Sequence, residues 1–461
     1  MDRLTADDRL MLWPDEIWPQ EIGALAVLDG SRLLGPSGGL RIEAVREAIG
    51  ARLHLVPRFR QLLHLPRRGL GGPLWVDAPA FDLADHVRVA PLPAPGDENQ
   101  LLLATEQLRR QRLDRSRPLW AMWLLPGLPG HRVGLFVKMH HAIADGIAGV
   151  ATVAALLDTA PDAPAGPARP WRPAPPPAAR DLLADSLRRH AGDLGHAFSA
   201  LAHPGTITRQ GRAAWPAMRQ LVAGPPGART SLDRVVGPGR NLALIRSDLD
   251  LVTKAAHAHG AKVNDVLLTI TAGGLRGLFR SRGEPVEDVM LPIYVPVTLR
   301  PAQLRDQARG NQIGQMVVPL PIGVPDPGRR LERIAAETAR QKVESHPALG
   351  HLLGSRIARR ALLKLLDRQP VSLTSADVPG PPVPLYLAGA QLLEVFPVLP
   401  LIAKVSLGVG ALSYAGQFTI MAVADQDACP DLGVFAASAR DELRALAASA
   451  PARPRSPSVS P

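Results

Sequence analysis

Eight prolines lie between residues 160 and 178, and this cluster constrains the fold most because such a segment continues neither a helix nor the interior of a sheet. It predicts a semi-rigid connection between two parts of the chain. The 461 residues suit two domains of roughly 100–200 residues each. We expect a first half over 1–160, a linker and basic helical crossover over 161–230, a second half over 231–450, and a disordered tail over 451–461.

Strand and helix patterns alternate on both sides of the linker, which predicts an α/β (α+β) fold. In the first half the periodicity favours strands at 23–29, 121–125 and 133–139, and helices at 40–53, 101–112 and 146–157. In the second half it favours strands at 242–245, 289–297 and 316–320, and helices at 251–259, 264–279, 328–343 and 352–366.

Charge and composition limit the classes of partner. The net charge of +11 favours anionic partners such as acidic lipid headgroups or phosphate-bearing molecules. Aromatic residues make up only 4% of the chain, so we expect no nucleic-acid partner bound by base stacking. A single cysteine, Cys429, excludes a disulfide framework, and the acidic start of the chain does not resemble a secretion signal. These features predict a cytoplasmic protein.

An uncharged stretch at 405–424 is long enough to cross a bilayer. It is interrupted by Gly408, Gly410 and Gly416 and carries several polar side chains, so it would insert only weakly. We therefore expect two buried strands around a turn near 414–416.

The most chemically informative segment is Lys138-Met139-His140-His141-Ala142-Ile143-Ala144-Asp145-Gly146, where an expected strand runs into two consecutive histidines. Neighbouring strand residues face opposite sides, so both imidazoles cannot face one cleft if the strand persists. A histidine titrates near neutral pH and can take the proton of an alcohol, which could then attack a thioester. Spacing alone, however, favours two structural histidines.

Other interpretations of this segment follow from the same residues. A metal site is disfavoured because the spacing places no three ligands on one face of a regular element, so we expect no metal. Asp145 either caps the helix at 146–157 or pairs with a distant arginine. Gly146 allows a sharp turn or a close approach of the backbone.

Taken with other segments, His-His-x-x-x-Asp-Gly resembles the signature of the coenzyme-A-dependent acyltransferase superfamily, which includes the condensation domains of peptide synthetases. The other segments resemble, in the expected order, short blocks of the bacterial wax ester synthase/diacylglycerol acyltransferase family. These blocks lie at 56–60, 73–77, 113–120, 263–266, 295–300, 310–312, 378–381 and 412–416. The resemblance extends from about Leu4 to Leu446, and the ordered set is specific although each block is short.

The resemblance implies two chloramphenicol-acetyltransferase-like halves that form a pseudo-dimer with a tunnel between them. It implies transfer of a long acyl group to diacylglycerol or a fatty alcohol without an acyl-enzyme. Acyl-coenzyme A would be the co-substrate, with no permanently bound cofactor. His141 would be the base and Asp145 mainly structural, His140 would face away, and Arg300 is the expected partner of Asp145.

The matched blocks also contain candidate substrate contacts. They are Pro118, Leu119, Trp120, Asn264, Asp265, Ser413 and Tyr414. For the first three, packing beside the tunnel is favoured over chemistry. Asn264 either caps the helix that follows it or contributes to the site. Ser413 and Tyr414 either donate hydrogen bonds near the site or form a strand turn.

Two positions depart from the family pattern. Asp377 and Asp233 stand where the family usually has asparagine. An added carboxylate near the tunnel would change its polarity and therefore the choice of acceptor.

Apolar substrates suggest contact with a membrane or lipid-droplet surface. The helix expected at 352–366 has an apolar stripe flanked by arginines and Lys364, which fits a basic helix on an anionic surface. An ordinary core-facing helix with a solvated basic side is the favoured alternative.

Two other functions are compatible with the motif. One is a condensation-type enzyme that forms an amide or ester from a carrier-protein thioester, although the chain has no attached carrier segment. The other is a non-catalytic lipid-binding homologue, which the intact histidine block disfavours.

Overall fold

A computed structural model of the chain describes residues 2–12, 14–36, 38–163, 166, 169–202, 228–298, 313–344 and 371–449. These residues form two six-stranded sheets and a separate small three-stranded sheet. The small sheet consists of β1 (Asp2–Arg3), β4 (Leu74–Asp77) and β3 (Gln61–His64). Short helices near the first sheet are α1 (Ala6–Leu12) and the 3-10 turns Gly30–Arg32, Leu53–Leu55, Pro57–Arg60 and Leu83–Asp85.

The first six-stranded sheet holds the two histidines at the end of a central strand. Its order is β12 (Tyr386–Leu387), β13 (Ala390–Val398), β2 (Glu21–Asp29), β7 (Arg132–His140), β6 (Trp120–Leu128) and β5 (Val87–Val89). Successive apolar side chains of β7 point to opposite faces of the sheet, and helices pack on both faces. Leu135, Val137 and Met139 pack with α2 (Ile42–Arg52) and α4 (Gly146–Ala154), while Phe136 packs with α3 (Glu98–Arg110).

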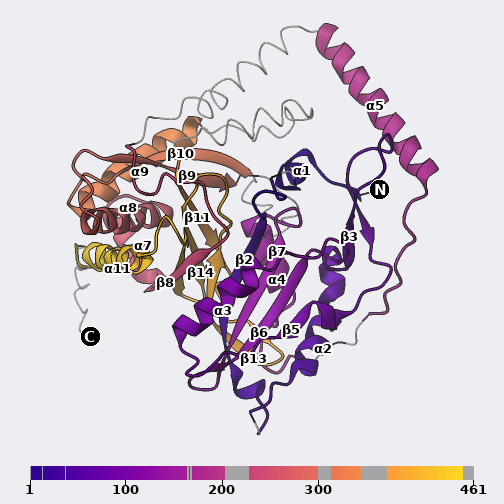
Figure 1. Ribbon diagram of the computed structural model, residues 1–461, viewed down its shortest axis with the longest axis horizontal. Helices are drawn as coiled ribbons and strands as arrows, with labels where there is room; N and C mark the ends of the chain where they lie inside the picture. The colour runs from indigo at the N-terminus through magenta and orange to yellow at the C-terminus, as the bar shows by residue number, and fades with distance from the viewer. Residues whose placement is uncertain are drawn as a thin grey trace, which may run out of the picture.

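The second six-stranded sheet has its helices on one face. Its order is β10 (Ile313–Pro321), β9 (Met290–Thr298), β11 (Leu373–Pro379), β14 (Leu407–Tyr414), β15 (Gln417–Asp425) and β8 (Arg240–Asp248). The helices are α7 (Leu249–Ala258), α8 (Val263–Ser281), α9 (Pro327–Glu344) and α11 (Leu432–Ser449), which Figure 1 shows gathered on one side of these strands. They enclose one apolar core with the sheet.

The uncharged stretch at 405–424 forms most of β14 and β15, which pair antiparallel around residues 415 and 416. The expected pair of buried strands is therefore confirmed. None of the helices that the structure describes is long and apolar enough to span a bilayer.

The two sheets do not follow a simple division of the chain at the linker. Strand β13 comes late in the sequence, yet it pairs antiparallel with β2 of the first sheet. Neither β11 nor β13 was predicted from sequence periodicity.

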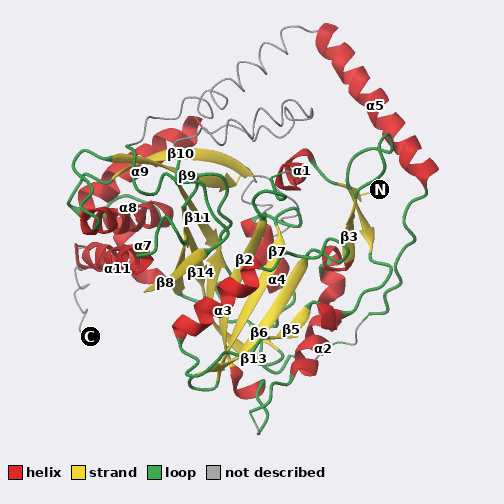
Figure 2. Ribbon diagram, in the orientation of Figure 1, coloured by secondary structure: helices red, strands yellow, loops and turns green. Residues whose placement is uncertain are grey.

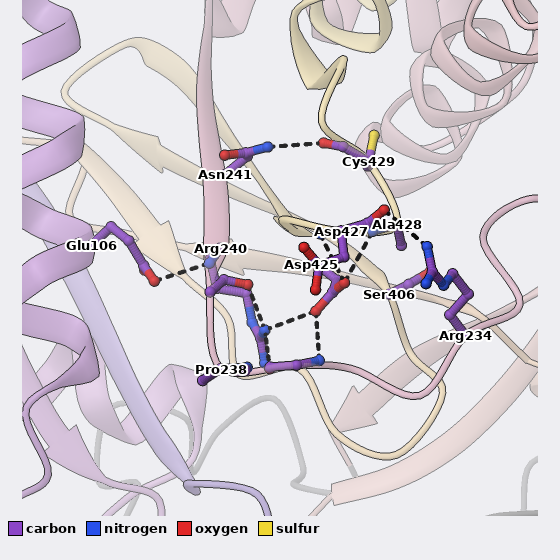
Figure 3. Close-up of polar contacts among 12 residues, drawn as sticks. Glu106, Arg234, Pro238, Arg240, Asn241, Ser406, Asp425, Asp427, Ala428 and Cys429 are labelled. Carbon is purple, nitrogen blue, oxygen red and sulfur yellow. Dashed lines mark hydrogen bonds and ion pairs between the residues drawn. The ribbon is translucent and has the colours of Figure 1, made fainter.

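Helix α3 connects the two halves through charged contacts. Glu106 on α3 accepts a hydrogen bond from the backbone N–H of Arg240 at 2.9 Å, as Figure 3 shows. The Arg240 guanidinium lies 3.2 Å from the buried carboxylate of Asp425 on β15. Glu98 at the other end of α3 pairs with Arg246 of β8 at 2.6 Å. Each end of α3 is thus attached to β8, the edge strand of the second sheet.

The described part of the linker lies against the first half. Arg60 lies over the Trp171 ring, 4.8 Å from its centroid, and Ala174 donates its backbone N–H to Asp77 at 3.0 Å. Helix α5 (Ala179–Ala202) follows and stands apart from the two large sheets in Figure 2. Arg3 holds its first turns through Asp185 at 2.5 Å.

Several sequence expectations concern residues outside those that the structure describes. They are Arg300, the helix at 352–366, the crossover beyond residue 202 and the tail at 451–461.

Candidate active site

Strand β7 ends at His140, and its pairing fixes where the histidines emerge. The backbone N–H of His140 donates to the Leu119 carbonyl at 2.9 Å, and that of His141 donates to the Gln20 carbonyl at 2.7 Å. His140 continues the face of Phe136 and Lys138 and is 3% exposed, whereas His141 follows the strand and is half-buried. The two histidines therefore differ in burial, and their different roles stay a prediction.

The His140 ring lies between two polar partners. The N–H of Ala142 donates to Nδ1 at 3.0 Å. Because Nδ1 accepts this hydrogen, the ring proton of the neutral imidazole is on Nε2. Nε2 lies 3.4 Å from Oδ1 of Asp15. His140 therefore faces away from solvent and connects the turn after β7 to a buried carboxylate.

Asp15 is held by several donors. Its Oδ1 accepts the backbone N–H of Gln20 at 2.7 Å, and Oδ2 lies 2.6 Å from Arg115 and 3.2 Å from Arg112. Burial raises the pKa of this carboxyl, but its contact with the His140 ring and its hydrogen bonds with the Gln20 amide and Arg115 outweigh burial and hold the pKa well below its usual range. Asp15 is therefore a buried anion at neutral pH.

Asp145 begins helix α4. Its side chain accepts the N–H of Ala148 at 2.9 Å, which satisfies one of the free amides of the first turn. Its capping role is thus confirmed. Pairing with Arg300 stays a prediction, because Arg300 lies outside the described residues.

Gly146 is where α4 approaches the other half. A Cβ atom at this position would lie 3.3 Å from Cγ2 of Val378, at the end of β11. This agrees with the expected close approach of the backbone. It also places the loop between His141 and Gly146 at the boundary between the halves.

The Pro118-Leu119-Trp120 block supports the end of β7. The Leu119 carbonyl accepts the backbone N–H of His140. The Trp120 ring stacks on the rings of Phe59 and His86, with centroid distances of 4.3 and 4.6 Å. Its indole N–H donates to the Phe59 carbonyl at 2.8 Å, and the side chain is 1% exposed. These contacts favour the packing interpretation over substrate contact for Trp120.

A pocket of about 110 Å³ opens beside Pro118 and Trp120. Charged side chains line much of it, including Asp85, Arg88 and Arg117. Its volume is far below the roughly 300–1,000 Å³ of typical small-molecule sites, so it does not hold a long acyl chain.

Asp265 and its neighbour Asn264 lie at the start of α8. The helix begins at Val263, so the expectation that Asn264 is the cap is wrong. Lys262 occupies the N-cap position, and Asp265 in the first turn accepts the Lys262 N–H at 2.9 Å. The other oxygen of Asp265 accepts the Thr338 hydroxyl at 2.7 Å. Both oxygens of Asp265 therefore serve structure.

Ser413 and Tyr414 end β14. The Tyr414 hydroxyl donates to the Leu392 carbonyl at 3.0 Å and accepts the N–H of Leu385 at 2.7 Å. The Ser413 carbonyl accepts the N–H of Gly380 at 2.9 Å. Of the alternatives for this block, these contacts favour the structural one.

The two unusual aspartates differ in position. Asp233 is exposed and accepts the N–H of Thr230 in a surface turn, so it adds no carboxylate to the interior. Asp377 is half-buried on β11 next to Val378, and burial raises the pKa of its carboxyl to about 6. Only Asp377 therefore lies beside the boundary that Gly146 and Val378 define.

Lys138 was not among the predicted residues. It is 1% exposed, pairs with Glu21 at 3.0 Å and donates to the Leu108, Arg109 and Gln111 carbonyls at the end of α3. The sequence signal that could have identified Lys138 is a lysine inside an otherwise apolar strand, two residues before His140. Asp15 and Gln20 had no comparable signal.

A metal site would need several ligand side chains in one place. Within the described residues, no three side chains of His, Cys, Asp or Glu come together in a group that could hold a metal ion.

Two family models match the sequence. The wax ester synthase/diacylglycerol acyltransferase catalytic domain matches residues 4–267, and the corresponding C-terminal domain matches residues 309–447. A Mycobacterium tuberculosis protein named probable diacylglycerol O-acyltransferase is 30% identical over 437 residues, which cover 93% of this chain and 91% of that protein. Another from the same species, named putative diacylglycerol O-acyltransferase, is 30% identical over 407 residues, 85% and 84% of the two chains.

Solved structures share the fold. The wax ester synthase/diacylglycerol acyltransferase from Marinobacter aquaeolei VT8 matches with a TM-score of 0.68 at 22% identity, over 97% of this chain and 99% of that one. The first condensation domain of the calcium-dependent antibiotic synthetase matches with a TM-score of 0.61 at 18% identity, over 97% of each chain. The expected architecture of two acyltransferase halves is confirmed by these similarities.

Proposed function

The chain belongs to the wax ester synthase/diacylglycerol acyltransferase family and is an acyltransferase, and we propose that His141 is its catalytic base. The reaction moves a long-chain acyl group from acyl-coenzyme A to diacylglycerol or a fatty alcohol. The observation that supports the role of His141 most directly is its position. It follows a rigid central strand, its backbone is fixed by Gln20, and it lies four residues before the cap of α4.

The proposed mechanism needs one imidazole. His141 removes the proton from the acceptor hydroxyl, and the oxygen attacks the thioester carbonyl to form a tetrahedral intermediate. The carbon–sulfur bond then breaks, and the imidazolium returns the proton to the coenzyme A thiolate. The products are the ester and free coenzyme A, and no acyl-enzyme forms.

The two substrates would meet at the boundary between the halves. The close approach of Gly146 to Val378 supports this placement, because it brings the histidine loop against the end of β11. Acyl-coenzyme A acts here as a co-substrate rather than as a resident cofactor.

We also propose that the protein works in the cytoplasm at the surface of a membrane or lipid droplet. The net charge of +11 supports attraction to anionic lipid. On α5, Leu183 and Leu187 are exposed one turn apart, with Arg180, Arg188 and Arg189 nearby in sequence. Apolar side chains flanked by basic ones suit an anionic lipid surface.

Vesicle binding tests the membrane proposal. Binding should increase with the fraction of anionic lipid and weaken with salt. A Leu183→Glu/Leu187→Glu variant should bind less than Leu251→Glu, which changes an exposed leucine on α7 instead. Salt-independent binding would count against the proposal.

Thiol release by the purified protein tests the reaction. Free acyl-coenzyme A should give thiol release that depends on an added alcohol, across a panel of diacylglycerols and long alcohols. Turnover only with a carrier-protein thioester would favour a condensation-type enzyme. Lipid binding without turnover of any donor would favour a non-catalytic homologue.

A further inference from the structure

A set of contacts among Asp15, Gln20, His140 and Ala142 holds the backbone around His141. It starts at Asp15, whose Oδ1 accepts the Gln20 N–H at 2.7 Å and lies 3.4 Å from Nε2 of His140. The Gln20 carbonyl accepts the His141 N–H at 2.7 Å, and His140 accepts the Ala142 N–H at 3.0 Å. Asp15 is thus connected to the residues immediately before and immediately after His141.

We propose that Asp15 and His140 form a positioning pair that orients His141, an inference that rests on the proposed role of His141 as the base. Neither residue needs to touch substrate. His140 fixes the turn after β7 through the Ala142 amide. Asp15 contacts the His140 ring and accepts the N–H of Gln20, whose carbonyl accepts the His141 N–H. A small displacement of a catalytic group is costly in rate because proton transfer depends on orientation.

Asp15 is also anchored by charged donors. Its second oxygen is bound by Arg115 at 2.6 Å and Arg112 at 3.2 Å, so the carboxylate has charged donors on the side opposite His140. Both arginines flank Leu113-Asp114 and precede the Pro118-Leu119-Trp120 block. The segment 112–120 therefore supports the histidines in two ways: through the Leu119 carbonyl, which accepts the His140 N–H, and through Arg115, which holds Asp15.

The tautomer of His140 allows its two contacts to be removed separately. An asparagine at this position presents a polar atom near the place of Nδ1, and a glutamine presents one near the place of Nε2. His140→Asn should therefore keep the Ala142 contact and lose Asp15, whereas His140→Gln should keep the Asp15 side and lose the Ala142 acceptor.

The test measures kcat, KM for acyl-coenzyme A and the melting temperature of full-length variants. We expect Asp15→Asn, His140→Asn and His140→Gln each to lower kcat by about 10- to 100-fold. KM should stay within about twofold, because the network orients the base without binding substrate. Arg115→Gln, which leaves Arg112 in place, should lower kcat less than Asp15→Asn.

Asp425→Asn is the matched control. Asp425 is also buried and arginine-bound, but it lies on β15 in the contact between Arg240 and α3 (Figure 3). It should lower the melting temperature while kcat changes less than twofold. A purely structural role for Asp15 predicts equal effects of the Asp15 and Asp425 variants on kcat, and this result would overturn the proposal.

The experiment also separates this proposal from the proposed function. If His141→Ala is inactive while Asp15→Asn and Arg115→Gln have wild-type kcat, Asp15 and His140 do not orient His141, and the role of His141 as the base stands. If folded His141→Ala has normal turnover, the proposed mechanism itself is wrong. If Asp15→Asn does not fold, Arg115→Gln and His140→Asn decide the question by the same comparison of kcat and KM.

Discussion

Gly146 and Val378 meet across the boundary between the two halves, where a Cβ atom on the glycine would lie 3.3 Å from Cγ2 of the valine. The contact joins the first residue of α4 to the end of β11. Because α4 follows directly from the histidine loop, its separation from β11 also sets the position of that loop.

Replacement of Gly146 by alanine should therefore displace α4 or Val378. A shift of a few tenths of an ångström relieves the contact, so we expect a loss of stability of at most about 1 kcal/mol, together with reduced turnover. In Gly146→Ala/Val378→Ala the smaller neighbour removes the conflict, so part of both losses should return. Denaturant unfolding and thiol release measure the two effects, and strictly additive effects would contradict a direct contact.

The two roles considered for Asp145 can be separated by two substitutions. Asp145→Ala removes the cap of α4 and should cost about 1 kcal/mol of stability, whereas Asp145→Asn keeps a good capping side chain. If Asp145 also pairs with Arg300, as we propose, Asp145→Asn should still reduce turnover strongly. Wild-type activity of Asp145→Asn would show that capping is its whole contribution.

Asp377 gives the protein a pH-dependent stability. Burial raises the pKa of its carboxyl from 3.8 to about 6, so the folded state holds this proton more tightly than the unfolded state. Its contribution to stability is therefore most favourable at low pH and is lost as pH rises from about 4 to 6. Asp377→Asn should stabilise the protein by up to about 3 kcal/mol above pH 6 and have little effect below pH 4. An effect that does not change with pH would contradict this assignment.

Lys138 should matter for stability more than any exposed lysine. Burial lowers the pKa of its ammonium group, although the nearby Glu21 carboxylate opposes the shift. Lys138→Met leaves Glu21 buried without this cation, which should cost about 3–5 kcal/mol. Adding Glu21→Gln should recover part of the loss. As a control, Lys254→Met, which changes an exposed side chain on α7, should change stability by less than about 1 kcal/mol.

The sequence predicted the elements that depend on local pattern. The apolar runs of β6 and β7 and the turn-rich residues between them were sufficient for that hairpin. The position of Asp145 suggested a cap, but it left pairing with an arginine equally open. The buried pair β14 and β15 was recognised because its glycines and polar residues excluded a membrane span.

Other features depend on contacts between distant residues. The pairing of Asp15 with His140 joins the start of the chain to the end of β7, and no local periodicity encodes it. The same holds for β13, which pairs with β2 although the two strands are far apart in sequence. Asn264 was a plausible cap by residue type, but α8 begins one residue earlier, so Lys262 occupies the N-cap position and Asp265 accepts its N–H.

The most direct test of the account is turnover by His141→Ala. The variant protein should retain its melting temperature, because His141 is half-buried at the end of a strand rather than in a core. With acyl-coenzyme A and an accepted alcohol, thiol release should fall by about 10²- to 10⁴-fold, the usual contribution of a general base. A folded variant that releases thiol at the wild-type rate would contradict the assignment of His141 as the base.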